Sequence, residues 1–150
     1  MEDSCLDIYA LSNYSCLMLP LAIETVSAGF PSPAEEYIDI GIDLNRELIK
    51  HPTSTFLLRV SGHSMTNVGI HNGDLLIVDR SIDAQPGKIV IAILDGCFTV
   101  KKLTYANEKL YLEASSPNYP PIDISRYESI QIWGVAIYCI HNLNHISKSL

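Results

Sequence analysis

The sequence has few basic residues, and they are unevenly distributed. The 150 residues include ten Lys and Arg and seventeen Asp and Glu, which gives a formal net charge of −7. Proteins bind nucleic-acid backbones through clustered cations, so this balance argues against direct DNA or RNA binding. No Lys or Arg precedes Arg46, and residues 1–28 alone have a net charge of −4. The N-terminal segment is therefore a different kind of polypeptide from the remainder.

Long apolar runs are also absent. No stretch reaches the roughly 18 consecutive apolar residues that a membrane-spanning helix needs. Residues 16–23 are apolar and residues 26–28 imitate a signal-peptidase site, but the N-terminus is acidic and Pro20 and Glu24 interrupt the run. A secretory signal needs a positive start and a longer run. We therefore expect a cytoplasmic protein without membrane attachment.

The four cysteines do not form a CxxC pair or a set with zinc-ligand spacing. They are Cys5, Cys16, Cys97 and Cys139. This pattern is typical of reduced cytosolic thiols rather than of a disulfide framework. His141 and His145 are four residues apart, but no third ligand lies near them in the sequence. We expect a frayed C-terminal tail, no metal site and no cofactor.

The remaining pattern predicts one β-rich domain behind an N-terminal arm, residues 1–28. Apolar residues make up 47% of the chain, which is enough for the core of one domain. Asp43 can cap a short helix that ends before Pro52. The predicted strands are residues 55–60, 74–79, 88–94, 97–103, 110–113 and 130–140. Asp95-Gly96, between two of these strands, is a strong hairpin signal. We predict a mainly β fold of about seven strands, compact and partly barrel-like.

Ser64 is a candidate nucleophile. It follows a predicted strand and lies between glycine-containing turns, although most serines in such turns have only local hydrogen-bonding roles. A catalytic triad would use His63 or His71 as its base, with Asp74 or Asp79 as the third member. His63 is adjacent to Ser64, and neighbouring side chains of an extended segment point apart. His71 lies in a polar turn, so the triad is the less favoured arrangement.

A lysine is the other possible base. Burial lowers the pKa of a lysine, and its neutral amine can then accept a proton. Lys101 and Lys102 lie on the second strand of the predicted hairpin, where alternation allows only one of them to face inward. The residue pattern does not decide between them, and a strand lysine taken alone is more often exposed to solvent.

Three ordered motifs carry a family resemblance. They are SGHSM at 61–65, GDLLIVD at 73–79 and GCFTVKKL at 96–103. Together they closely resemble the UmuD/LexA family of self-cleaving Ser/Lys peptidases. GFPSPA at 29–34 and IDLN at 42–45 are similar to the UmuD branch. The resemblance extends over nearly all of residues 28–140 and implies a compact LexA/UmuD-like β domain.

The resemblance implies specific functional residues. It makes Ser64 the nucleophile, Lys101 rather than Lys102 the general base, and Ala28-Gly29 the cleaved bond. Lys101 lies 37 positions after Ser64, and Ser64 lies 36 positions after Ala28, which are spacings similar to those of the family. Residues 1–28 would then be removed by self-cleavage, leaving residues 29–150 as a dimerisation domain. His63 departs from the family, in which Asp often stands at this position.

The resemblance also implies an SOS-response mutagenesis protein and its partners. A RecA–single-stranded-DNA filament would stimulate the cleavage, and the processed homodimer would join a UmuC-like Y-family subunit in an error-prone translesion DNA polymerase. Residues 1–28 are too few for the helix-turn-helix domain of LexA-type repressors, so we expect no sequence-specific DNA binding. Trp133 and Tyr138 belong either to the core or to the dimer interface. The alternatives are a non-catalytic binding module of the same fold and a signal-peptidase-like processing enzyme.

Overall fold

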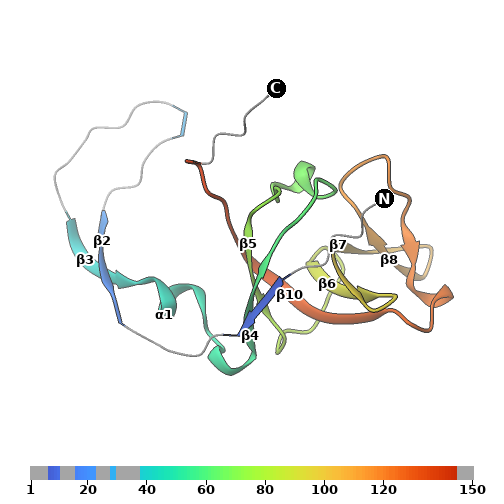
Figure 1. Cartoon of the computed structure of the whole chain (residues 1–150), viewed down its shortest axis with the longest axis horizontal. Coiled ribbons are helices and arrows are strands. Elements are labelled where there is room, and N and C mark those ends of the chain that lie inside the picture. Colours follow the sequence, from blue (N-terminus) through green and yellow to red (C-terminus); the bar gives the residue numbers. More distant parts are fainter. Residues whose placement is uncertain (1–6, 11–15, 23–27, 30–37, 145–150) are drawn as a thin grey trace. The chain divides into compact units, whose positions relative to one another are not determined.

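The computed structural model describes residues 7–10, 16–22, 28–29 and 38–144 (Figure 1). These residues belong to two compact units. One lies within Met1–Leu11 and His51–Leu150, and the other within Ser12–Lys50. Each unit has its own β-sheet.

The described part of the larger unit is built on an eight-stranded antiparallel sheet. Its strands are β1 (Asp7–Ala10), β4 (Thr55–Arg59), β5 (Leu75–Asp79), β6 (Ile89–Leu94), β7 (Cys97–Ala106), β8 (Lys109–Glu113), β9 (Ile122–Asp123) and β10 (Gln131–Ile140). Their order in the sheet is β1-β4-β5-β10-β6-β7-β8-β9, so the last strand lies between β5 and β6 (Figure 1). Among its described residues, this unit also has the 3-10 helices η1 (Pro52–Ser54), η2 (Thr66–Val68) and η3 (Ile124–Arg126).

The mainly β fold predicted from the sequence is confirmed, with two differences. Among the described residues the outer strands β1 and β9 do not pair with each other, so the sheet is not closed into a barrel. The sheet also includes β1, which lies within the N-terminal arm and pairs with β4 from Asp7↔Arg59 to Ala10↔Phe56. The sequence did not predict this strand, because its partner is about fifty residues away.

The hairpin of β6 and β7 follows the local signal. The turn residues Asp95 and Gly96 both have positive φ, 49° and 78°, as a two-residue turn of type I′ requires. The strands then pair from Leu94↔Cys97 to Ile89↔Lys102. The predicted hairpin is confirmed.

Two buried clusters form the core of the part that the structure describes, and β6 contributes to both. Val90 and Ala92 belong to one cluster, whereas Ile91 between them belongs to the other. Since successive side chains of a strand point to opposite faces, β6 is buried on both of its faces. This burial explains its nearly continuous apolar sequence, IVIAIL.

Trp133 packs against the cluster that contains Ile91. Its ring centroid is 5.2 Å from that of Phe56 and 5.1 Å from that of Phe98, and the Cζ of Arg80 lies 4.6 Å from its ring centroid. Trp133 is therefore a core residue. Tyr138, five residues further along β10, is 45% exposed.

The described residues of the smaller unit form two antiparallel strands and a short helix. These are β2 (Met18–Ala22), β3 (Ile38–Asp43) and α1 (Leu44–Leu48). The predicted helix cap is confirmed, because the Asp43 carboxylate accepts a hydrogen bond of 3.1 Å from the Asn45 N–H. Among the described residues, no helix has the length and apolar character that a membrane span requires.

Candidate active site

Ser64 lies in the loop between β4 and β5, and this loop is fixed by the turn that precedes β5. The Val60 N–H donates to the Asp74 carbonyl and the Gly73 N–H donates to the Val60 carbonyl, both at 2.8 Å. The Gly62 N–H donates to Asn72 Oδ1 at 2.9 Å. Gly62 has a φ of 96°, a conformation that a residue with a Cβ adopts only under strain. The chain therefore reaches Ser64 through a constrained path.

A second segment, distant in the sequence, also holds the Ser64 backbone in place. Ser115, which follows β8, donates two hydrogen bonds to the Ser64 carbonyl, from its N–H at 2.9 Å and from its Oγ at 3.0 Å. The Ser115 Oγ also accepts a hydrogen bond of 3.2 Å from the Asn67 N–H. Sequence reasoning missed Ser115, because its contact with Ser64 depends on the chain returning to this loop after 51 residues.

Ser64 lines a small pocket. The other lining residues are Val60, Ser61, Gly62, Met65, Phe98, Thr99 and Val100. The last three belong to β7 and directly precede Lys101. The pocket therefore joins the loop of the candidate nucleophile to the strand of the candidate base. Within the described residues, Ser64 Oγ and Lys101 Nζ share no hydrogen bond, so their catalytic pairing stays a prediction.

Lys101 is half-buried, and this burial lowers the pKa of its amine below the usual 10.5. It pairs across the sheet with the fully buried Val90. Its Nζ lies 5.9 Å from the centroid of the Tyr119 ring. A lysine in this environment loses its proton at a lower pH than a solvent-exposed one.

The Ala28-Gly29 bond lies in the connection between β2 and β3 of the smaller unit. Both residues are exposed, and a Cβ added to Gly29 would meet no atom within 4 Å. Its neighbours at 23–27 and 30–37, including the prolines that favour an extended chain, lie outside the described residues. The assignment of this bond as the cleavage site stays a prediction.

Asp79, one of the two aspartates considered for a triad, is engaged by neighbours other than Ser64. It is 1% exposed, and its carboxylate accepts hydrogen bonds from Ser54 and from the N–H and Oγ of Ser81. The His51 Nδ1 lies 2.5 Å from its Oδ2. Burial raises the pKa of Asp79, but these hydrogen bonds outweigh burial and lower it to about 2. This carboxylate stabilises the end of β5.

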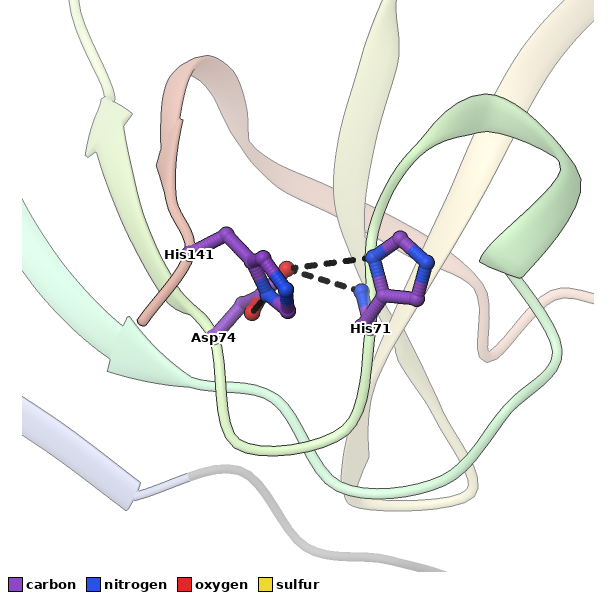
Figure 2. A group of neighbouring side chains, drawn as sticks. All are labelled: His71, Asp74 and His141. Atoms are coloured by element: carbon purple, nitrogen blue, oxygen red, sulfur yellow. Dashed lines mark hydrogen bonds and ion pairs between the residues drawn. The ribbon is translucent and has the colours of Figure 1, made fainter. Parts of the chain in front are cut away.

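Asp74, the second aspartate, is 2% exposed and lies between two histidines (Figure 2). It accepts hydrogen bonds from the His71 N–H at 2.8 Å and from Cys139 Sγ at 3.2 Å, and the His141 Nδ1 lies 2.5 Å from its Oδ1. Burial raises the pKa of Asp74, but these hydrogen bonds lower it below its usual value. Burial and the Asp74 carboxylate raise the pKa of Cys139 to about 12.

The position of His141 differs from the predicted one. The sequence predicts that His141 lies in a frayed C-terminal tail, four residues before His145. The structure places it against Asp74 instead, 67 positions earlier in the chain, whereas His145 lies outside the described residues. The sequence carried no signal for this contact, because it requires the pairing of β5 with β10. Both triad aspartates therefore have partners other than Ser64.

Comparison with known proteins agrees with the motifs. Residues 20–137 match the family model described as Peptidase S24-like. The chain is 44% identical over 127 residues to the ImpA protein of Escherichia coli, an alignment that covers 85% of this chain and 86% of that protein. It is 39% identical over 136 residues to MucA of Escherichia coli, covering 89% and 92%. It is 43% identical over 122 residues to SamA of Salmonella typhimurium, covering 81% and 84%.

The matched region includes both Ser64 and Lys101 as well as the Ala28-Gly29 bond. The family predicted from the three sequence motifs is thereby confirmed. The chain belongs to the Peptidase S24-like family, as a UmuD-like self-cleaving serine peptidase of SOS mutagenesis.

Proposed function

We propose that the chain cleaves its own Ala28-Gly29 bond, with Ser64 as nucleophile and Lys101 as general base. The observation that carries this proposal is the pocket that Ser64 shares with Phe98, Thr99 and Val100, the residues directly before Lys101. Two further observations support it. Burial lowers the pKa of Lys101, and both residues of the Ala28-Gly29 bond are exposed.

The reaction begins with a proton transfer. The neutral amine of Lys101 accepts the Ser64 hydroxyl proton while Oγ attacks the Ala28 carbonyl carbon. The carbonyl oxygen becomes an oxyanion in the tetrahedral intermediate. Within the described residues, the backbone N–H groups of Ser64 and Met65 donate to no protein acceptor. We therefore assign them as the donors that stabilise this oxyanion.

The intermediate then collapses and releases the new N-terminus. The Lys101 ammonium gives its proton to the Gly29 nitrogen as the C–N bond breaks, which leaves Ala28 esterified to Ser64. Water, deprotonated by the neutral Lys101, hydrolyses this ester and restores the serine. The products are residues 1–28 with a free carboxylate and residues 29–150 with a free amine.

The residue types at the cleaved bond suit the small pocket at Ser64. The methyl group of Ala28 needs little space beside Ser64, and Gly29 has no Cβ to obstruct the approach of Oγ. Because enzyme and substrate share one chain, the local concentration of the bond is high. If the cleavage-ready arrangement is a minor conformer, the observed rate falls in proportion to its population.

The lasting role follows the cleavage. A RecA–single-stranded-DNA filament raises the population of the cleavage-ready conformer, and the homodimer of residues 29–150 serves a UmuC-like Y-family polymerase in translesion synthesis. With a net charge of −7, the chain itself does not supply the cations that bind DNA, so the DNA contacts belong to these partners. This role places the protein in the cytoplasm with RecA and the polymerase.

Intact-mass spectrometry of the purified chain, with and without an activated RecA filament, tests the cleavage. We expect two fragments that divide after Ala28, no cleavage of Ser64→Ala, and strongly slowed cleavage of Lys101→Ala. Lys102→Ala, one position along the same strand, is the matched control and is cut like the wild type. Cleavage of Ser64→Ala, or a cut at another bond, would overturn the proposal. A wild-type chain that stays intact with the filament would favour the non-catalytic module.

A further inference from the structure

The group of His71, Asp74 and His141 lies at one end of two paired strands. His71 and Asp74 belong to the turn that leads into β5, and His141 directly follows β10. The pairing Ile140↔Leu75 holds the end of β10 beside the start of β5. Figure 2 shows both imidazole rings next to the Asp74 carboxylate, one from each chain segment.

The potential ligand atoms of the three residues are close together. One nitrogen from each histidine and one Asp74 oxygen all lie within 4.8 Å of one another. The ring centroids of His71 and His141 are 4.8 Å apart. Asp74 is buried, whereas His71 and His141 are 48% and 43% exposed, so the group opens to solvent on its histidine side.

A structural hydrogen-bond network around Asp74 explains the position of the His141 ring but not that of the His71 ring. The backbone N–H of His71, the Cys139 thiol and the His141 ring already satisfy the Asp74 carboxylate. The His71 ring is not needed for that purpose. Its Nδ1 lies 3.9 Å from Asp74 Oδ2, which is too long for a hydrogen bond, yet it faces the same carboxylate (Figure 2).

Two imidazoles and one carboxylate are donors that suit a transition-metal ion. Zn²⁺ takes histidine nitrogen and aspartate oxygen in a tetrahedral arrangement, with bonds of about 2.0–2.2 Å. Donor atoms of such a site are roughly 3.3 Å apart by that geometry. The separations of 2.5 Å for His141 and 3.9 Å for His71 lie on either side of this value. A small rotation of the exposed His71 ring would bring the three donors to one ion.

We propose that His71, Asp74 and His141 bind one divalent transition-metal ion, with Zn²⁺ as the preferred ion and water completing its coordination. The ion would take the place of the direct contact between His141 Nδ1 and Asp74 Oδ1. It also connects the end of β10 to the turn that supports the Ser64 loop through Val60 and Gly62. This site is separate from the pocket at Ser64 and does not depend on the proposed cleavage.

Titration calorimetry of the full chain with Zn²⁺, in the presence of a phosphine reductant, tests the site. We expect the titration to give one ion per chain. In thermal unfolding, the melting temperature should rise by several degrees when Zn²⁺ is in excess. Replacement of Zn²⁺ by Co²⁺ should give an adduct that absorbs visible light. His71→Ala and His141→Ala should each weaken Zn²⁺ binding at least about tenfold, since even the loss of an outer contact to a metal ligand often costs that much. His63→Gln removes an exposed imidazole outside the group and serves as the matched control.

Several outcomes would overturn the proposal. One is the absence of saturable Zn²⁺ binding by a wild-type chain whose circular dichroism shows that it is folded. Another is equal binding by wild type, His71→Ala and His141→Ala, which is what coordination by the cysteine thiols would give. Because both histidines are half-exposed, their replacement leaves the core intact and the comparison interpretable.

Discussion

The contact between Ser115 and the Ser64 carbonyl offers a test of how the structure positions the nucleophile. Ser115→Ala removes two hydrogen bonds of the side chain, the 3.0 Å bond donated to the Ser64 carbonyl and the 3.2 Å bond accepted from the Asn67 N–H. It leaves the 2.9 Å bond from the Ser115 N–H in place. At roughly 0.5–1.5 kcal/mol for each bond, the free energy of unfolding should fall by about 1–3 kcal/mol.

The same substitution should slow self-cleavage. A displacement of a catalytic group by about 1 Å can cost on the order of 100-fold in rate. Because the Ser64 carbonyl keeps one of its two hydrogen bonds from Ser115, we expect the cleavage rate to fall by about tenfold. Cleavage is followed by intact mass under conditions in which every variant is folded, and stability is measured by urea unfolding in a Ser64→Ala background, which keeps the chain whole.

Ser116→Ala is the matched control for this experiment. Ser116 is the next residue, and its Oγ only accepts a long hydrogen bond of 3.4 Å from the Asn118 N–H. We expect this variant to cleave and unfold like the wild type. If Ser115→Ala loses stability but cleaves at the wild-type rate, Ser115 does not position Ser64 for cleavage.

Three further predictions concern ionisation and packing. Lowering the pKa of Asp79 from 3.8 to about 2 corresponds to about 2 kcal/mol of stability, which is present above pH 3.8 and lost as the pH falls toward 2. Urea unfolding at several pH values should therefore show that the free energy of unfolding depends less on pH in Asp79→Asn than in wild type. Replacement of the exposed Asp83, in Asp83→Asn, should leave the pH dependence of wild type unchanged. Because burial lowers the pKa of Lys101, the cleavage rate should rise with pH and level off below pH 10.5, and a rate that falls across this range would contradict a neutral lysine base. Gly134→Ala would place a Cβ 2.7 Å from Val78 Cγ1 and should destabilise the fold by about 1–3 kcal/mol, and unchanged urea unfolding would contradict that packing.

Features that depend on neighbouring residues were predictable from the sequence. The Asp95-Gly96 turn adopts the positive φ values of its type, and Asp43 caps α1 as expected. β5 occupies residues 75–79 and β10 residues 131–140, within one residue of their predicted ranges. In each case the signal lies within a few residues of the element that it specifies, so no tertiary information is needed.

Features that depend on distant pairing were not predictable. Nothing within residues 7–10 indicates that they would pair with β4. Ser115 becomes important only because the chain after β8 returns to the Ser64 loop. His141 meets Asp74 because β10 lies beside β5, whereas sequence spacing alone suggested His145 as its neighbour. The assignment of Lys101 over Lys102 likewise came from the family resemblance and not from strand alternation.

Covalent labelling of Ser64 tests most directly whether Lys101 activates it. The folded chain is treated with a fluorophosphonate, which reacts with activated serines, and the modified residue is located by peptide mass spectrometry. We expect labelling at Ser64 that increases with pH, is abolished in Lys101→Ala and is retained in Lys102→Ala. Labelling of Ser64 at an undiminished rate in Lys101→Ala, or exclusive labelling of another serine, would show that Lys101 does not activate Ser64.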